Sequence, residues 1–127
     1  MRNVGSMTQY YFTDFELIGA VETNSELRSL FEKDYKLPSS KDVESFLEDN
    51  QLSPDVYVIA NSTENHLNVI EQITAVSNPV GILCEKPLAY NVDEALEICK
   101  LCEERKIKIF RLNFFVIHFR LSNILVV

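Results

Sequence analysis

Four short runs of apolar residues divide the chain, and longer stretches with helical spacing separate them. The runs are Glu16–Val21, Asp55–Ala60, Val80–Cys84 and Ile107–Leu112. Each is nearly continuous in Val, Ile, Leu or Phe, with little alternation of apolar and polar positions. Such runs are typical of strands whose two faces are both covered, as in a parallel sheet. The pattern therefore predicts four buried strands.

The clearest helix follows Pro87. Asn91 can accept a hydrogen bond from the first turn, and Glu94 three residues later fits a capping box. An apolar stripe is predicted at three- and four-residue steps, comprising Val92, Ala95, Leu96, Cys99 and Cys102. We interpret the Cys99–Cys102 pair as core rather than as a redox or zinc site, because it lies in mid-helix without a second pair.

Three further helices are predicted between the strands. One begins after Ser62 or Thr63 and runs to about Ser77, and the others are Ser25–Tyr35 and Lys41–Asn50. Strands that alternate with helices imply crossover connections, which place the helices on the faces of a parallel sheet. The predicted fold class is therefore α/β.

Composition and charge exclude several classes of function. The chain has 127 residues, about one domain, and a net charge of −7, which argues against nucleic-acid binding. Residues 109–127 are apolar, but Arg111 and Arg120 interrupt them, which argues against a membrane span. Three cysteines without a signal peptide predict a cytoplasmic protein without disulfides. No metal site is predicted.

The candidate site residues follow from the predicted sheet. In parallel α/β sheets, ligands bind beyond the carboxyl ends of the strands. The segments at these ends are Glu22–Asn24, Asn61–His66, Glu85–Pro87 and Asn113.

Glu85, Lys86 and Pro87 stand at the end of one predicted strand. Pro87 disfavours the helical conformation for the residue before it, and so holds Lys86 extended at the strand end. A lysine there could exchange a proton with a substrate hydroxyl. The alternative is a solvated lysine in an ordinary turn between a strand and a helix.

Two other strand ends have residues suited to a nucleotide. An acid such as Glu22 can accept hydrogen bonds from both hydroxyls of an adenosine ribose and would repel a 2′-phosphate, which favours NAD over NADP. Asn61, Ser62, Thr63 and His66 lie where a strand passes into a helix, and the free N–H groups there could hold a phosphate or a ribose. Alternatively, Glu22 is an ordinary surface residue, and His66 is a residue at a helix end whose ring is hydrogen-bonded to the backbone.

Three segments together resemble the nucleotide-binding domain of the Gfo/Idh/MocA oxidoreductases. They are DVYVIANSTENHL (55–67), GILCEKPLA (81–89) and NVDEA (91–95). The resemblance covers roughly residues 15–113. It implies a Rossmann-like fold, an NAD(P) cofactor, and a sugar, polyol or sugar-nucleotide substrate.

The same resemblance implies roles for single residues. Lys86 would lie beside the nicotinamide and the substrate as the catalytic residue, with Glu85 and Pro87 close to the nicotinamide. Glu22 would bind the adenosine ribose. The turn from Asn61 to His66, with Ser62 and Thr63, would lie against the cofactor.

The chain departs from the family pattern at both ends. The family opens with a strand and a Gly-x-Gly-x-x-Gly turn for the pyrophosphate, whereas this chain has only Gly5, Gly19 and Gly81. We therefore expect an incomplete sheet that lacks the first strand and this turn. The family also continues into a substrate domain, which we do not find after Asn113.

These departures give the expected organisation and two functional interpretations. The organisation is a divergent segment 1–14, a nucleotide-binding domain 15–113, and an apolar tail 114–127 through which the chain could associate. The first interpretation is an NAD(P)-dependent oxidoreductase of this type. The second is a truncated, catalytically inactive fragment or interaction module, in which cofactor binding is weak or absent.

Overall fold

The strands form one parallel sheet, with a helix between most strands that follow each other in the chain. This computed structural model describes residues 16–111 and 123–127. Within them the sheet has six strands in the order β2-β1-β6-β3-β4-β5, and every neighbouring pair is parallel. The strands are β1 (Glu16–Val21), β2 (Ser39–Ser40), β3 (Val56–Ile59), β4 (Gly81–Cys84), β5 (Lys108–Arg111) and β6 (Asn123–Val126). The predicted α/β fold with a parallel sheet is confirmed.

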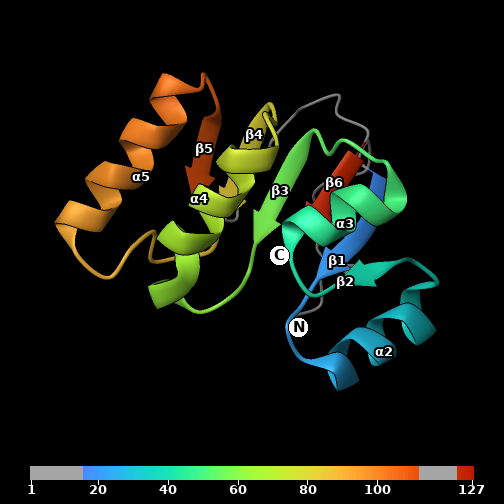
Figure 1. Ribbon diagram of the computed structural model, residues 1–127. Coiled ribbons are helices and arrows are strands. Elements are labelled where there is room, and N and C mark those ends of the chain that lie inside the picture. The colour runs from blue at the N-terminus through green and yellow to red at the C-terminus, as the bar shows by residue number, and fades with distance from the viewer. Residues whose placement is uncertain (1–15, 112–122) are drawn as a thin grey trace.

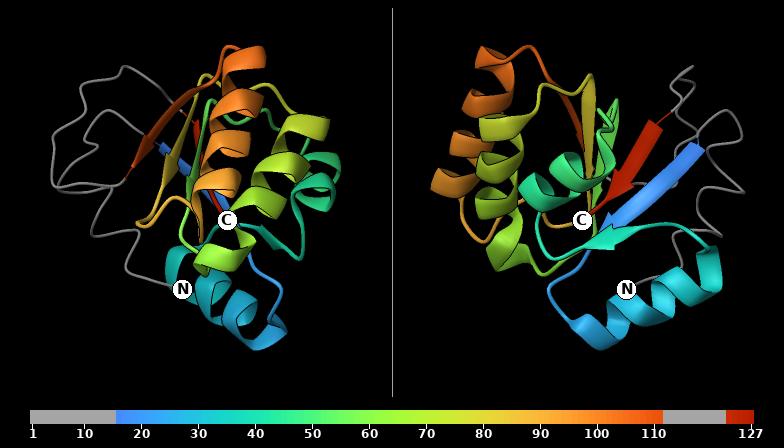
Figure 2. Two further views of the ribbon diagram at one scale, coloured as in Figure 1. Left: turned by 90° about the vertical axis from the view of Figure 1, so that its left-hand side faces the viewer. Right: turned by 45° about the vertical axis from the view of Figure 1, so that its right-hand side comes forward.

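Within the described residues, three helices cover one face of the sheet. α3 (Val43–Asn50), α4 (His66–Val76) and α5 (Val92–Glu104) lie side by side there, and α4 contacts both of the others (Figure 1). A short 3-10 turn, η1 (Thr63–Asn65), leads into α4. α2 (Ser25–Tyr35) instead lies beside β1 and β2, away from this layer (Figure 2).

β6 occupies the middle of the sheet, between β1 and β3. Ile124 pairs with Leu17 of β1 and with Val56 of β3. The ladder continues beyond the strand, because the N–H of Val127 donates to the carbonyl of Val58 at 2.8 Å. β6 thus occupies a central position for which the sequence analysis predicted no strand, and within the described residues the sheet is continuous from β2 to β5.

The predicted end segments are only partly within the described residues. Residues 1–14 and residues 114–122 of the predicted tail lie outside them. Residues 123–126 of that tail form β6, where Ile124, Leu125 and Val126 are each at most 1% exposed. These three side chains belong to the core, so they offer no surface for association. The domain boundaries at 15 and 113 stay predictions.

α5 begins as predicted but turns a different face to the core. Asn91 caps it, accepting a hydrogen bond from the N–H of Glu94 at 2.9 Å. Its buried side chains are Ile98 and Cys102. The predicted stripe is wrong at three positions, all of which are exposed, namely Val92, Leu96 and Cys99. The helix is oriented by its packing against α4 and β5, which the helical period alone does not specify.

β1 approaches α3 closely at Gly19. A Cβ atom there would lie 2.5 Å from Cε2 of Phe46 and 2.6 Å from the carbonyl oxygen of Pro38. Phe46 is fully buried, and its ring uses the space that a side chain at Gly19 would need. Glycine is therefore required at this position for lack of space.

We expect Gly19→Ala to lower the free energy of unfolding by about 2 kcal/mol, because a fixed backbone oxygen and a buried ring both oppose the added methyl group. Urea denaturation measures this difference. Gly81→Ala is the matched control, since its nearest contact would be Lys108 O at 3.2 Å. A Gly19→Ala protein as stable as the Gly81→Ala protein would contradict the packing described here.

Candidate functional site

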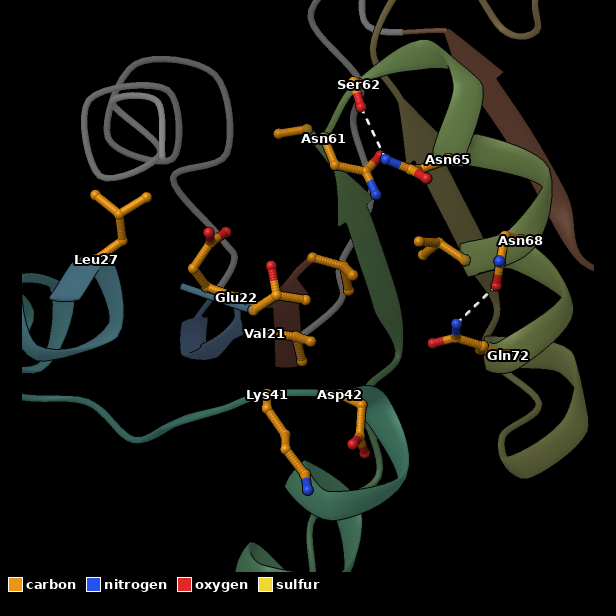
Figure 3. A pocket seen from close by; sticks show the side chains of 14 residues that line it. Val21, Glu22, Leu27, Lys41, Asp42, Asn61, Ser62, Asn65, Asn68 and Gln72 are labelled. Atoms are coloured by element: carbon orange, nitrogen blue, oxygen red, sulfur yellow. Dashed lines mark hydrogen bonds between the residues drawn. The ribbon is translucent and has the colours of Figure 1, made fainter. Parts of the chain in front are cut away.

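A pocket lies at the point where the order of the strands reverses. From β1 the chain moves to β2 at one edge of the sheet, whereas β3 leads to β4 and β5 at the other edge. Ligands of open α/β sheets bind at such a reversal, outside the carboxyl ends of the strands. The pocket has a volume of about 480 Å³ (Figure 3). Its lining residues are Val21, Glu22, Thr23, Leu27, Lys41, Asp42, Ala60, Asn61, Ser62, Asn65, Asn68, Val69, Gln72 and Val127.

The turn after β1 holds Glu22 at the pocket. Its backbone N–H donates to Ser40 O at 2.9 Å, which ties the turn to the end of β2. The Arg28 guanidinium donates to the carbonyl oxygens of Glu22 at 2.7 Å and Thr23 at 3.0 Å. The Glu22 carboxylate makes one long contact, accepting from Asn24 N at 3.4 Å. The backbone of this turn is thus well held, and the carboxylate keeps acceptor capacity toward the pocket.

Lys41 and Asp42 line the pocket at the start of α3. Asp42 is the N-cap of that helix and accepts a hydrogen bond from Ser45 N at 2.8 Å. This bond lowers the pKa of Asp42 below its usual value of 3.8, and the Ser45 side chain and the nearby Lys41 charge act in the same direction. Asp42 is therefore ionised at neutral pH, and the two side chains present opposite charges to the pocket.

The side of the pocket formed by α4 and the turn before it is lined by carboxamides and carries no charge. Asn61, Asn65, Asn68 and Gln72 all belong to it. Asn65 Nδ2 donates to Ser62 Oγ at 2.8 Å. Gln72 Nε2 donates to Asn68 Oδ1 at 2.7 Å, and Figure 3 shows these two side chains pointing toward each other.

His66 is buried and does not line the pocket. It is 1% exposed, and its ring nitrogens lie 3.0 Å from Leu88 O and 3.1 Å from Asn61 O. The Cys84 thiol lies 3.3 Å from Nδ1, and burial raises the pKa of Cys84 to about 12, so the thiol keeps its proton. His66 thus links the segments that follow β3 and β4.

Glu85, Lys86 and Pro87 follow β4 at the same edge of the sheet but do not line the pocket. Glu85 N donates to Ile59 O at 3.0 Å, and Lys86 and Pro87 are exposed. The Lys86–Pro87 peptide bond is cis. Glu22 and Lys86 are three strand spacings apart in the sheet, which corresponds to about 14 Å.

The structure therefore brings together only some of the predicted site residues. Glu22, Asn61 and Ser62 line the pocket, whereas Thr63, His66, Glu85, Lys86 and Pro87 do not. The lining residues that sequence reasoning missed include Lys41, Asp42, Asn68 and Gln72. Asn68 and Gln72 are four residues apart on one predicted helix, but nothing in the sequence says that this face borders a pocket.

The described residues show neither a membrane-spanning helix nor a cluster of metal ligands. No helix among the described residues is long and apolar enough to cross a membrane. In the same part of the chain, no group of three His, Cys, Asp or Glu side chains is arranged to hold a metal ion.

We expect Asp42→Ala to lower the free energy of unfolding at pH 7 by about 1 kcal/mol, because α3 loses its cap. The folded pKa of Asp42 is depressed, so the part due to its charge is present above pH 3.8 and is lost as the pH falls through the folded pKa. Denaturation at pH 7 and pH 2 measures both effects. Asp42→Asn should fall below the wild-type protein at pH 7, and by less at pH 2. The control is Asp49→Ala, at an exposed position of α3. If wild type and Asp42→Asn differed in stability by the same amount at both pH values, the contribution of the Asp42 charge would be contradicted.

We expect His66→Leu to cost about 2 kcal/mol of stability, because the carbonyl oxygen that accepts from the ring N–H, Asn61 O or Leu88 O according to the tautomer, loses its donor inside the fold. His66→Gln keeps an N–H donor and should lose less. Urea denaturation of the two variants measures the difference. Equal stability of His66→Leu and wild type would show that the ring contacts do not contribute.

Comparisons with known proteins identify the family and the fold. The profile of the Gfo/Idh/MocA family, described as an oxidoreductase family with an NAD-binding Rossmann fold, matches residues 3–114. No protein with a curated function matches the sequence.

Several solved structures share the fold. The WlbA dehydrogenase from Chromobacterium violaceum, in complex with NADH and UDP-GlcNAcA, is 15% identical with a TM-score of 0.75, over 87% of this chain and 31% of its own. The WlbA dehydrogenase from Bordetella pertussis, with the same two ligands, is 21% identical with a TM-score of 0.68, over 76% of this chain and 28% of its own. A 3-ketoreductase from Actinomadura kijaniata, in complex with TDP-benzene and NADP, is 18% identical with a TM-score of 0.61, over 76% of this chain and 28% of its own.

These matches differ in what they establish. At such low identity, the solved structures show the fold alone, and this chain spans less than a third of each of the three proteins. The family profile covers most of the sequence. The chain therefore belongs to the Gfo/Idh/MocA oxidoreductase family and forms its NAD-binding Rossmann domain.

Proposed function

We propose that this chain binds a nicotinamide dinucleotide across the carboxyl edge of its sheet, and that the cofactor is NAD rather than NADP. The observation that supports this most directly is the position of Glu22. It lies at the end of a parallel strand, lines the pocket, and has a carboxylate with acceptor capacity to spare. An acid at this point of a dinucleotide-binding fold accepts the hydroxyl groups of the adenosine ribose.

The described residues fit the adenosine half of this cofactor. The ribose hydroxyls are donors, and the Glu22 carboxylate accepts only, so the two are complementary. A 2′-phosphate would instead bring two further negative charges toward Glu22. Lys41 lines the same pocket and could attract a phosphate, but the ionised Asp42 beside it offsets its charge. The balance of charges in the pocket therefore favours NAD over NADP.

The pyrophosphate has no glycine-rich turn to hold it in this sequence. Gly19 and Gly81 lie within strands, and Gly5 stands alone. Asn61, Ser62 and Thr63 offer amide, hydroxyl and backbone groups next to the pocket, and we propose that they contact the central part of the cofactor. Without the glycine turn, we expect weaker binding than in family members that have it.

Lys86 is proposed as the catalytic residue of the complete enzyme. The chemistry that a bound nicotinamide supplies is hydride transfer to or from a carbinol carbon. Lys86 would polarise the hydroxyl on that carbon or exchange its proton, with Glu85 and Pro87 beside it and His66 holding the neighbouring backbone. The separation of about 14 Å between the ends of β1 and β4 suits an extended dinucleotide whose two halves reach Glu22 and Lys86.

The substrate is proposed to be a sugar, a polyol or a sugar nucleotide. The family resemblance supports this, as do the UDP-GlcNAcA complexes of the two WlbA dehydrogenases. The contacts to the substrate would come from the part of the longer family members that this chain does not cover. We also propose a cytoplasmic location, because Cys84, Cys99 and Cys102 are free thiols.

A second candidate is nucleotide binding without turnover. The observation in its favour is that Glu85, Lys86 and Pro87 do not line the pocket that holds Glu22. In that case the chain would bind the cofactor, or its adenosine half, and the reaction would not occur on it.

Titration with NADH, followed by its fluorescence, tests the proposal. We expect saturable binding, with Glu22→Ala at least about tenfold weaker because the ribose hydroxyls lose a charged acceptor. NADPH should bind the wild-type chain more weakly than NADH, and Glu22→Ala should reduce that preference. Glu26→Ala, in the first turn of α2, is the matched control. Absence of NADH binding by a folded wild-type chain would refute the proposed function, and unchanged binding in Glu22→Ala would refute the role of Glu22.

A further inference from the structure

We propose that Asn68 and Gln72 recognise the base of the bound nucleotide and make the pocket selective for adenine. This inference rests on the proposed binding of a dinucleotide. It concerns two residues that sequence reasoning did not single out, on a different element from the ribose-binding Glu22. Both line the pocket that Glu22 lines.

The two side chains are fixed relative to each other. They lie one turn apart on α4, and Gln72 Nε2 donates to Asn68 Oδ1 at 2.7 Å. This bond orients both amides, because a donor on one must face an acceptor on the other. The groups that this bond leaves entirely free are the Asn68 Nδ2 donors and the Gln72 Oε1 acceptor. The pair thus offers the pocket a donor on Asn68 and an acceptor on Gln72, one at each end of the bonded pair (Figure 3).

That arrangement complements adenine. Adenine presents the N6 amino donor beside the N7 acceptor, and Asn and Gln side chains commonly pair with this edge of the base. Guanine presents two acceptors, O6 and N7, at the same edge. Hypoxanthine differs from adenine by an oxygen in place of the N6 amino group, so it also presents two acceptors there. Gln72 Oε1 would then face an acceptor and make no bond.

The polarity of the pocket supports the assignment of the base to this side. Glu22, Lys41 and Asp42 are charged and come from the turn after β1 and the start of α3, and the ribose hydroxyls would lie beside Glu22. The α4 side is neutral, and Val69 adds an apolar contact beside the two amides. A neutral heterocycle with both a donor and an acceptor edge fits a neutral amide surface better than a charged one.

The competing interpretation is that Asn68 and Gln72 form an ordinary surface pair. Side chains four residues apart on a helix often bond to each other and stabilise it slightly. Such a pair would not distinguish one base from another. The two interpretations therefore differ in the selectivity of binding rather than in stability.

The experiment compares NADH with reduced nicotinamide hypoxanthine dinucleotide, which differs only at the base. We expect the wild-type chain to bind NADH about tenfold more tightly. Asn68→Ala and Gln72→Ala should each bring this ratio close to one, mainly by weakening NADH binding. Glu71→Ala, at an exposed position of α4 outside the pocket lining, is the matched control and should keep the wild-type ratio. Circular dichroism of each variant verifies that α4 is intact.

Failure of this inference can be told apart from failure of the proposed function. Saturable NADH binding with an equal affinity for the hypoxanthine analogue would overturn base recognition and leave dinucleotide binding standing. A wild-type preference for NADH that persists in both Asn68→Ala and Gln72→Ala would also overturn it. If a folded wild-type chain binds neither dinucleotide, both the proposed function and this inference are refuted.

Discussion

The parallel pairing of β6 with both β1 and β3 is the interaction on which the rest of this structure depends. Without it, β1 and β3 would each present a row of unpaired N–H and C=O groups, and the two halves of the sheet would not be joined. With it, the carboxyl ends of β1, β6 and β3 lie next to one another. That placement brings Glu22 and Asn61 to one pocket, although they are far apart in the sequence.

Around this sheet edge, the backbone is held by local hydrogen bonds that leave side chains available. Arg28 satisfies the carbonyls of the turn after β1, and Asp42 caps α3 while facing the pocket. His66 connects the backbone after β3 with the loop after β4. Residues near the pocket thus also stabilise the fold. A substitution at Asp42 or His66 would change both stability and the pocket, so the two effects have to be measured separately.

Much of the local structure follows from the sequence. β1 and α2 have the predicted limits, Glu16–Val21 and Ser25–Tyr35, because continuous apolar runs and polar caps act over a few residues. β2 was not predicted, since two serines show no apolar pattern. The apolar stripe of α5 was misplaced, because Val92 and Leu96 are as apolar as Ile98 and the sequence does not show which side faces α4.

By itself, the sequence determined the alternation of strands and helices, the parallel sheet and the family, and it placed Glu22, Asn61 and Ser62 at strand ends. Those properties depend on period, capping and short-range spacing. Only the tertiary structure decided that Asn123–Val126 is the central strand, that His66 is buried, and that Asn68 and Gln72 border the pocket. The reason is that strand order and helix orientation depend on contacts between distant segments. A short apolar run can make such contacts at any open position of a sheet.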